Sequence, residues 1–352
     1  MNFTSSNRNE LTFSSINHTN DCIVFGTSTG FYVYNINPLK KIIARKIPGG
    51  VSIVKMLYKS NIFIFTGNVE KGLYPNKKLI IWDDHKRSVI GEIIFKKQIL
   101  NIKVTKTIII VVTINKIYVY NFKDLSLIKS IETVKNSRGL CSISDNHLIA
   151  YPGDNTGEIK ISKYNEDFLS VIKAHVNDIE IYNLSKDGKY IITCSNKGTL
   201  IRIYTIENGS LFKELRRGSD QVQIIDLKLS EDNKYALCSS SKGTIHIFII
   251  DMEQEEVLED KKMNTKMGWG IQKLTSFLPE YFNSEWSFSQ IKIPNVLLYS
   301  NFIKNLDEIV SIGDNGCFYV LNFNEATGII EKNYKFISDE DDPFNNRTTT
   351  IK

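Results

Sequence analysis

A short pattern that recurs along the chain limits the folds open to it. The pattern Ser-x-Lys-Gly-Thr, followed by alternating apolar residues, occurs at 195–203 and again at 240–248, so that Gly198 and Gly243 lie 45 residues apart. The chain around these copies consists of short runs rich in Ile, Val, Tyr and Phe, separated by Asn, Asp, Gly and Ser, which predicts strands joined by turns. A period of about 40–45 residues with several strands is typical of a β-propeller blade.

A second run, of alternating aromatic and aliphatic residues, supplies the third strand of further blades. It occurs at 30–35, 116–121 and 316–322, and 82–83 matches the dipeptide of WD repeats. The chain divides on this basis into seven blades, at 11–47, 51–95, 99–133, 139–173, 179–215, 223–250 continued by 286–293, and 296–336. Each blade contains its own four strands, so we expect a ring closed without a borrowed outer strand. The predicted fold is all-β, a seven-bladed β-propeller of WD-repeat type with four antiparallel strands per blade and a long loop in blade six.

The predicted domain organisation is a single propeller with two terminal segments and one insertion. We expect a flexible N-terminus at 1–10, the propeller at 11–337, and a disordered tail at 338–352 that begins with acidic residues. The insertion, at 251–285, interrupts blade six and is the one stretch that follows no repeat.

The insertion begins with a polar, acidic half and continues with apolar residues at helical spacing. Two interpretations are open. The segment packs as a helix or loop on the side of the propeller, or part of it enters a membrane interface. In the second interpretation we expect Trp269, Ile271 and Leu274 to insert, because Trp favours the headgroup boundary. The aromatic residues that follow are expected to pack on blade six.

The composition indicates the cellular compartment in which the protein is found. Hydrophobic residues make up 42% and charged residues 24% of the chain, which is typical of a globular protein in water, and the net charge is +5. Five cysteines without a C-x-x-C pair indicate a reducing compartment, with neither a disulfide framework nor a zinc site. Residues 1–10 lack the apolar core of a secretory signal, and the apolar run 108–112 is too short to span a bilayer. We therefore predict a cytoplasmic protein whose membrane association is peripheral.

No pattern of residues predicts catalysis. The chain has no P-loop, G-x-G-x-x-G, H-E-x-x-H or G-x-S-x-G motif, and its five histidines lack the spacing of metal ligands. The carboxylates occur largely in polar turns, and no stripe of basic and stacking aromatic residues indicates nucleic-acid binding. We predict a protein that is not an enzyme, with no cofactor, no metal and no nucleic-acid partner.

Two adjacent arginines stand at the end of a predicted strand, in the sequence Leu215-Arg216-Arg217-Gly218. Successive side chains of a strand point to opposite faces, so Arg216 and Arg217 are expected on different sides, both at the surface. Each guanidinium is suited to bidentate binding of phosphate. We expect Gly218 to permit a sharp turn. The alternative interpretation is a solvated basic turn without a ligand.

The segment 215–220 resembles the F/L-R-R-G motif of the PROPPINs, which are seven-bladed propellers that bind phosphoinositides and include the WIPI proteins of animals. The resemblance covers nearly the whole ring and is strongest from 173 to 248. Further matches lie at 76–84, 139–141, 276–282 and 286–288.

This resemblance implies two lipid sites at the rim, one on each side of the arginine pair. The first site would consist of His175, Ser195, Thr199, Arg202 and Arg216. The second site would consist of Arg217, Ser239, Ser240, Thr244 and His246. Hydroxyl and guanidinium groups are suitable partners for phosphate oxygens. The insertion in blade six corresponds to the membrane-inserting loop of the family.

The function that the resemblance implies is that of a phosphoinositide effector. It would bind phosphatidylinositol 3-phosphate and phosphatidylinositol 3,5-bisphosphate and recruit autophagy machinery to autophagosomal, endosomal or vacuolar membranes. The family also binds the bridge-like lipid-transfer protein of autophagy through blades one to three, and 17–21 occupies the place of one contact loop, with Thr19 where some relatives have an acidic residue. We expect a monomer in solution. The alternative function is a WD-repeat scaffold for protein complexes without a lipid role.

Overall fold

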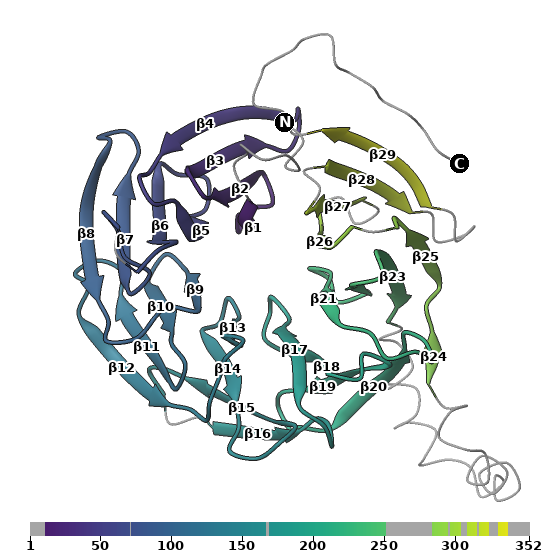
Figure 1. The fold of residues 1–352 in the computed structure, drawn as a ribbon. Helices are drawn as coiled ribbons and strands as arrows, with labels where there is room; N and C mark the ends of the chain where they lie inside the picture. The colour runs from purple at the N-terminus through teal and green to yellow at the C-terminus, as the bar shows by residue number, and fades with distance from the viewer. Residues whose placement is uncertain are drawn as a thin grey trace, which may run out of the picture.

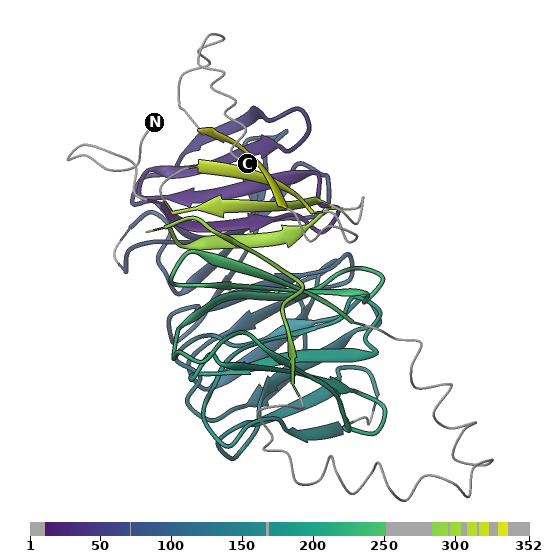
Figure 2. The same ribbon diagram turned by 90° about the vertical axis from the view of Figure 1, so that its right-hand side faces the viewer.

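The described strands form seven sheets arranged in a ring (Figure 1). The structure is a computed structural model that describes residues 11–70, 72–166, 169–250, 284–294, 296–303, 308–314, 317–323 and 330–336. Six sheets contain four strands and one contains five, and within each sheet the first strand of the blade is innermost. Figure 2 shows that the strands run across the thickness of the ring. The prediction of an all-β, seven-bladed propeller is confirmed.

The strands follow the chain order within each blade. Blade one contains β1 (Leu11–Ile16), β2 (Cys22–Thr27), β3 (Gly30–Asn35) and β4 (Lys40–Lys46), and blade two contains β5 (Val51–Met56), β6 (Ile62–Gly67), β7 (Lys78–Asp83) and β8 (Ser88–Ile94). Blade three contains β9 (Asn101–Val104), β10 (Ile108–Val112), β11 (Lys116–Asn121) and β12 (Leu127–Glu132), and blade four contains β13 (Ser142–Ile143), β14 (Leu148–Pro152), β15 (Glu158–Lys163) and β16 (Leu169–Lys173).

The remaining three blades include the one added strand, which follows the long insertion. Blade five contains β17 (Ile179–Leu184), β18 (Tyr190–Ser195), β19 (Leu200–Thr205), β20 (Leu211–Arg216) and the added strand β24 (Glu285–Trp286). Blade six contains β21 (Ile224–Leu229), β22 (Tyr235–Ser240), β23 (Thr244–Ile249) and β25 (Ser289–Lys292), and blade seven contains β26 (Leu298–Phe302), β27 (Glu308–Gly313), β28 (Cys317–Phe323) and β29 (Ile330–Phe336).

The position of a strand in its blade explains its sequence pattern. All five residues of β10 are buried, because this strand lies inside a sheet that is covered by a neighbouring blade on each face. Its sequence is therefore an unbroken apolar run. The outermost strand β8 alternates instead between exposed and half-buried residues, since only one of its faces packs on protein.

The core of the ring lies between the blades. The buried residues form seven clusters, and each cluster joins two neighbouring sheets. The cluster that closes the ring packs Val310 and Phe318 of blade seven against Ile23 and Phe25 of blade one. Among the described strands, none crosses from one of these two sheets to the other. In this part of the chain the ring is thus closed by side-chain packing, as expected.

The repeated Lys-Gly-Thr turns require glycine. Gly198 has a φ of 67° and Gly243 a φ of 71°, in the left-handed region that residues with a Cβ rarely adopt. A Cβ atom on Gly198 would also lie 1.9 Å from the carbonyl oxygen of Val222, and one on Gly243 would lie 1.9 Å from that of Ile293. These turns therefore let the chain of the next blade pass close to the hairpin.

One prediction of strand assignment is wrong. We expected Trp286 to begin the fourth strand of blade six, but Glu285–Trp286 forms β24, which pairs in parallel with β20 at the outer edge of blade five (Figure 1). The outer strand of blade six is β25, which begins at Ser289. The physical reason is that an outer strand offers unpaired backbone groups, and the chain that returns toward blade six satisfies some of them on its way.

All five cysteines are buried, and none of them forms a disulfide. Burial raises the pKa of the thiols of Cys141 and Cys194 to about 12, so both remain protonated at neutral pH. They fill space in the inter-blade clusters as small apolar groups, which agrees with the sequence-based expectation of free thiols.

Candidate functional site

The arginine pair lies at the end of β20, where blade five meets both of its neighbours. Arg216 pairs across the sheet with Leu200, and Glu214 pairs with Arg202. Because cross-strand partners and alternate residues of a strand share a face, Arg216 lies on the same face as Arg202. Arg217 is the next residue and belongs to the opposite side, where its charge lowers the pKa of His246 in blade six. The expected separation of the two side chains is confirmed.

Both arginines are buried, which contradicts the expectation that they lie at the surface. Only 9% of Arg216 and 8% of Arg217 is exposed. The Nε of Arg216 donates to the hydroxyl of Ser284, 2.9 Å away, just before β24. The Nε of Arg217 donates to the carbonyl oxygen of Gly198 at 2.9 Å, and its Nη2 donates to that of Asp220. The returning chain and the neighbouring turns cover the pair, which no local pattern could predict.

The first predicted set lies mostly on the face of blade five that is turned toward blade four. Ser195 and Arg202 share this face with Arg216 through the register of β18, β19 and β20. His175, from the end of blade four, contacts it through its Nε2, which lies 3.0 Å from the hydroxyl of Thr193. These four predicted residues are therefore brought together on one side of the sheet.

Thr199 occupies a different position from the rest of its set. It lies in the turn before β19, and its carbonyl oxygen accepts a hydrogen bond of 2.9 Å from the backbone N–H of Arg217. Thr199 is thus connected to the second arginine rather than to Arg216. Thr199 as a whole is half-buried.

The charge of Arg202 is already balanced inside the protein. Its Nε donates to a carboxylate oxygen of Glu214 at 2.9 Å, and its Nη1 donates to the carbonyl oxygen of Ala174 at 2.8 Å. Burial, followed by the charge of Arg202, lowers the pKa of His175 to about 4. The imidazole of His175 is therefore neutral at pH 7.

The second predicted set lies on the face of blade six that is turned toward blade five. His246 pairs with Cys238, and Ser240 and Thr244 flank the turn on the same face. The Nδ1 of His246 lies 3.1 Å from the hydroxyl of Ser287, and burial, with the charge of Arg217, lowers its pKa to about 4. The hydroxyl of Ser240 is buried without a hydrogen-bond partner among the described residues.

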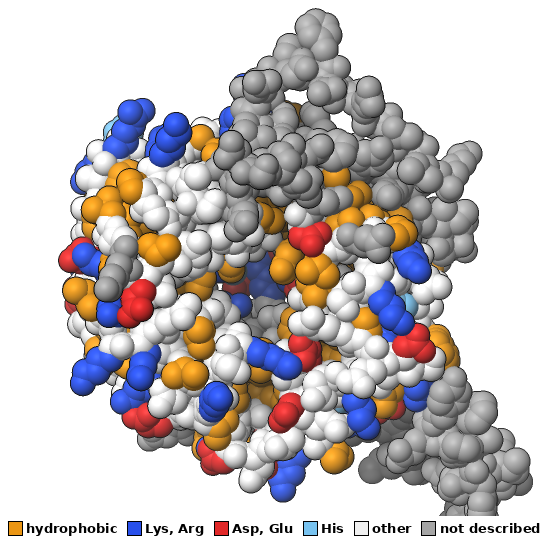
Figure 3. Space-filling view, viewed as in Figure 1, with side chains coloured by type: hydrophobic (Ala, Val, Ile, Leu, Met, Phe, Trp, Pro, Cys, Tyr) orange, Lys and Arg blue, Asp and Glu red, His pale blue; other side chains and the backbone are white. Residues whose placement is uncertain are grey.

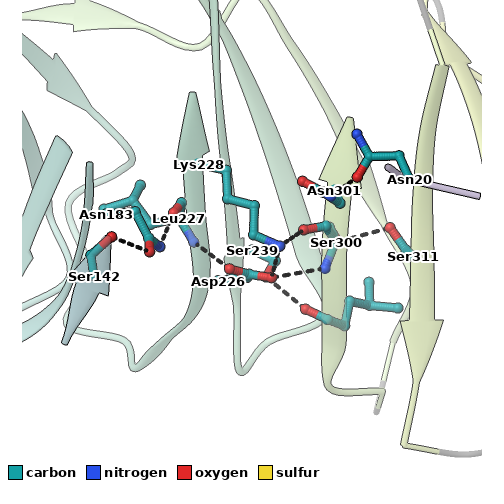
Figure 4. Close-up of polar contacts among 11 residues, drawn as sticks. Asn20, Ser142, Asn183, Asp226, Leu227, Lys228, Ser239, Ser300, Asn301 and Ser311 are labelled. Carbon is teal, nitrogen blue, oxygen red and sulfur yellow. Dashed lines mark hydrogen bonds and ion pairs between the residues drawn. The ribbon is translucent and has the colours of Figure 1, made fainter. Parts of the chain in front are cut away.

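Ser239 does not belong to this set, which corrects its assignment. It is fully buried, and its hydroxyl donates to the carbonyl oxygen of Leu298 in blade seven, 2.6 Å away (Figure 4). Neighbouring residues of a strand point to opposite faces. Since Ser240 faces blade five, Ser239 must face blade seven.

Comparison with known proteins places the chain in a family. The model of the PROPPIN family matches residues 13–289. The chain belongs to the PROPPIN family. This PROPPIN is 30% identical over 322 residues to Autophagy-related protein 18e of Arabidopsis thaliana, an alignment that covers 89% of this chain and 84% of the relative. It is 27% identical over 338 residues to Autophagy-related protein 18 of Dictyostelium discoideum, with 90% of both chains covered.

Solved structures share the fold of this PROPPIN. Hsv2 of Kluyveromyces lactis superposes with a TM-score of 0.74 at 25% identity, over 93% of this chain and 98% of the other. KlAtg21, solved in complex with the coiled-coil of AgAtg16, superposes with a TM-score of 0.70 at 22% identity, over 97% of this chain and 98% of the other.

The structure adds residues to the site that sequence reasoning missed. Glu214 neutralises Arg202, and Asp220 forms an ion pair of 2.8 Å with Lys242 beside Arg217. Glu214 and Asp220 lie within a few residues of the arginine pair, so their position along the chain could have indicated that they belong to the site. Ser284 and Ser287, which contact Arg216 and His246, offered none, because β24 had not been predicted.

The expectation for Gly218 is wrong. Its φ is not in the left-handed region, and a Cβ atom there would have no atom of the described structure within 4 Å. The backbone at Gly218 therefore does not demand glycine. No described residue therefore covers the surface beside the two arginines at this position.

Other predicted features lie partly or wholly outside the site. The expected insertion residues Trp269, Ile271 and Leu274 fall outside the described residues. In the loop of blade one, the Oδ1 of Asn17 accepts hydrogen bonds of 2.9 Å from the backbone N–H groups of Asp21 and Cys22. Asn17 therefore holds the turn and is only 4% exposed.

The described parts of the chain were also searched for metal-binding and membrane-spanning features. They contain no group of three or more His, Cys, Asp or Glu side chains arranged to hold a metal ion. Among the same residues, no helix has the length and apolar character needed to cross a membrane.

Proposed function

We propose that this PROPPIN is a phosphoinositide effector that binds phosphatidylinositol 3-phosphate and phosphatidylinositol 3,5-bisphosphate at two sites of the rim and recruits autophagy machinery to membranes. The observation that carries this proposal is the arrangement of Arg216 and Arg217 on opposite sides of β20. Each faces a separate set of hydroxyl and imidazole groups. Planar guanidinium groups beside hydroxyl donors are suited to phosphate esters.

In the second site, the hydroxyl of Ser240 supports a ligand, because it has no hydrogen-bond partner in the described part of the chain. A buried polar atom without a partner is unfavourable by about 1–3 kcal/mol. A phosphate oxygen beside Arg217 would accept hydrogen bonds from this hydroxyl and from the guanidinium together. The open space next to Gly218 offers an approach for a headgroup.

Each proposed site carries a small excess of positive charge. The first site has the positive charges of Arg202 and Arg216 and the negative charge of Glu214. The second has the positive charges of Arg217 and Lys242 and the negative charge of Asp220. One such site would bind a headgroup moderately. Two sites on one rigid ring raise the effective concentration of the second lipid, so the membrane is held more tightly than either lipid alone.

The proposed setting is peripheral to autophagosomal, endosomal or vacuolar membranes, with a monomer in solution. The insertion of blade six would add a hydrophobic contact, because apolar side chains gain about 25 cal/mol for each Å² removed from water. We include the bridge-like lipid-transfer protein as a proposed partner through blades one to three. Because the side chain of Asn17 is used in hydrogen bonds within its own turn, we expect the residues that contact this partner to be the more exposed ones around Asn17.

The alternative function is a WD-repeat scaffold without a lipid role. The burial of Arg216 and Arg217 favours it, because both side chains already have hydrogen-bond partners in the protein. In that case the arginines would fix the returning chain and the turn before β19, and serve only the fold.

Liposome flotation separates the two functions. We expect the protein to float with vesicles that contain either phosphoinositide and to remain in the soluble fraction with phosphatidylcholine alone. The variant Arg216→Ala/Arg217→Ala should lose flotation while its circular dichroism remains that of a β protein. Equal binding to plain vesicles, or no binding to any member of a phosphoinositide panel, would exclude the lipid function and favour the scaffold.

A further inference from the structure

The axis of the ring holds a cavity of about 440 Å³. Its lining comes from all seven blades, through the innermost strands or the segments that lead into them. Figure 3 shows basic side chains in the hollow at the centre of the ring. This volume lies within the range of pockets that hold small molecules, which is roughly 300–1,000 Å³.

The cavity has an excess of positive charge. Among its described lining residues, four carry a positive group, Lys55, Lys103, Arg138 and Lys228, and Asp226 carries the one carboxylate. They come from different blades and face a common space. Charges of one sign gathered in a concave site attract counter-ions of the other sign.

Asp226 is already engaged with its neighbours. Its carboxylate accepts hydrogen bonds from the backbone N–H groups of Leu227 at 3.0 Å and Ser300 at 3.2 Å, and it forms an ion pair of 3.0 Å with Lys228 (Figure 4). Lys228 also donates to the carbonyl oxygen of Ser300 at 2.9 Å. These bonds join blades six and seven and leave Asp226 matched to Lys228.

The charge of Arg138 is also balanced by a carboxylate. It forms an ion pair of 2.6 Å with Glu180 and donates to the carbonyl oxygen of Ile179 at 3.0 Å. Among the positive groups that line the cavity, those without an ion-pair partner in the described residues are therefore Lys55 and Lys103. The ammonium of Lys55 lies over the ring of Phe13, 4.7 Å from its centre.

The protein around these two lysines disfavours their charge. Burial, together with the charges of Lys103 and Lys228 and against that of Asp226, lowers the pKa of Lys55 to about 7. Burial is also the main cause of the lowered pKa of Lys103. Both side chains are half-exposed to the cavity but are surrounded by the walls of the ring. An anion between them would remove the mutual repulsion.

We propose that the central cavity is a binding site for a small anion that carries phosphate groups, held between the ammonium groups of Lys55 and Lys103. A phosphate group carries nearly two negative charges at neutral pH and several strong acceptor oxygens, so it matches two ammonium groups at once. The cavity has room for more than one such group. The site is separate from Arg216 and Arg217 and does not depend on the proposed rim sites.

The test is isothermal titration calorimetry with inorganic pyrophosphate at low ionic strength. We expect one pyrophosphate to bind per chain and to raise the melting temperature. Lys55→Met/Lys103→Met should weaken binding by about tenfold or more, because the methylene stems are kept and only the charges are removed. All of these proteins carry Arg216→Ala/Arg217→Ala, so that the proposed rim sites take up no pyrophosphate, and the exposed Lys189→Ala in the same background is the matched control.

A second titration identifies the source of the phosphate. Inositol 1,3-bisphosphate is titrated into Arg216→Ala/Arg217→Ala, in which the rim sites are removed. Binding here that Lys55→Met/Lys103→Met abolishes assigns a soluble inositol phosphate to the cavity, and binding of pyrophosphate alone assigns a free phosphate compound. If the double lysine variant does not fold, Lys103→Gln is measured in its place.

Three outcomes would overturn the proposal. One is the absence of binding by either compound in the arginine variant. Another is pyrophosphate binding that the lysine substitutions leave unchanged. The last is citrate binding as tightly as pyrophosphate, since a carboxylate would then serve as well as a phosphate.

Discussion

At the scale of single residues, the two arginines combine structural and binding roles. Arg216 and Arg217 are nearly as buried as core residues, yet Arg216 donates to the hydroxyl of Ser284 and Arg217 lies near the imidazole of His246 in blade six. A guanidinium is weakly hydrated compared with an ammonium, and its five donors can serve protein and ligand together. The same side chains can therefore fix the chain around β20 and contact phosphate.

Arg216→Ala should weaken the first site, Arg217→Ala the second, and the double change should abolish membrane recruitment. Each substitution removes charge-assisted hydrogen bonds worth about 1.5–3 kcal/mol. Because both side chains are buried, we also expect a lower melting temperature for each variant. The measurement is calorimetry with short-chain phosphoinositides, with the exposed Lys189→Ala in blade five as the control. A stoichiometry of one lipid per wild-type chain would contradict two sites.

Glu214→Gln should tighten lipid binding at the first site. The carboxylate of Glu214 neutralises Arg202 at 2.9 Å, and the amide would keep the side-chain shape while removing the negative charge. The gain should be modest, roughly 0.2–1 kcal/mol, since the pair is partly exposed to solvent. Calorimetric titration of Glu214→Gln and of Glu214→Gln/Arg216→Ala with a short-chain phosphoinositide measures the change in affinity. Equal affinity in Glu214→Gln and wild type would show that Glu214 does not face the ligand.

At the scale of elements, the hairpin turns of blades five and six are built for close approach. The backbone of one blade passes so near the turn of the previous hairpin that a single added carbon has no space. The turns carry Ser195 and Ser240 at one end and Thr199 and Thr244 at the other. The geometry of these turns thus places the hydroxyl groups of both proposed sites.

Gly243→Ala should destabilise the protein by about 1–3 kcal/mol, because the left-handed backbone is strained with a Cβ and the new atom meets the carbonyl oxygen of Ile293. Gly218→Ala, close to the arginine pair, is the matched control and should be nearly neutral, since a Cβ there meets open space. Urea denaturation of both variants gives the comparison. Similar losses in the two variants would show that the turn has no special demand for glycine.

Trp269→Asp/Ile271→Asp/Leu274→Asp tests the membrane role of the insertion, which lies outside the described residues. We expect the triple variant to leave vesicles while it still binds soluble inositol phosphates, because charges in an apolar interface oppose insertion. Flotation and calorimetry are measured on the same preparation. Unfolding of the variant would show that the segment packs on the propeller, and unchanged flotation would place insertion elsewhere.

At the scale of the whole molecule, the ring joins its blades by buried clusters and by polar contacts near the axis. The polar contacts include Ser142 with Asn183 across blades four and five at 3.4 Å, Asn183 with the carbonyl oxygen of Leu227 at 2.7 Å, and Asn301 with Asn20 across the closure at 2.9 Å. Figure 4 shows these groups on neighbouring innermost strands, except for Asn20, which lies in the turn between β1 and β2. They extend between blades, so the ring is expected to unfold as one unit.

Stability should fall as the pH drops from about 6.5 to 4. His175 and His246 have a folded pKa of about 4, below the value of about 6.5 expected in the unfolded chain. Between these values the unfolded chain binds more protons, so the contribution is complete above pH 6.5 and is lost as the pH approaches 4. Urea denaturation at pH 7.5 and 5 measures the loss.

The histidine substitutions show whether these two groups cause the effect. His175→Gln/His246→Gln should reduce the pH dependence, and the exposed His85→Gln should not. A double variant with the same loss between pH 7.5 and 5 as the wild type would assign the dependence to other groups.

The fold could be predicted because its determinants are local. A strand such as 108–112 is recognised from its own residues, and Gly198 and Gly243 mark the same turn in two successive blades, 45 residues apart. The opposite directions of Arg216 and Arg217 follow from the alternation of any strand. The sequence by itself therefore determined the number of blades, the order of their strands and the side of β20 on which each arginine lies.

What only the tertiary structure decided depends on which blade lies next to which face. Ser239 and Ser240 are equally plausible ligands in sequence, but the register of β22 turns one to blade seven and the other to blade five. The burial of Arg216 depends on β24, a segment far along the chain that pairs with the edge of β20. Edge pairing and cavity charge come from contacts between distant residues, and a local pattern carries no information about such contacts.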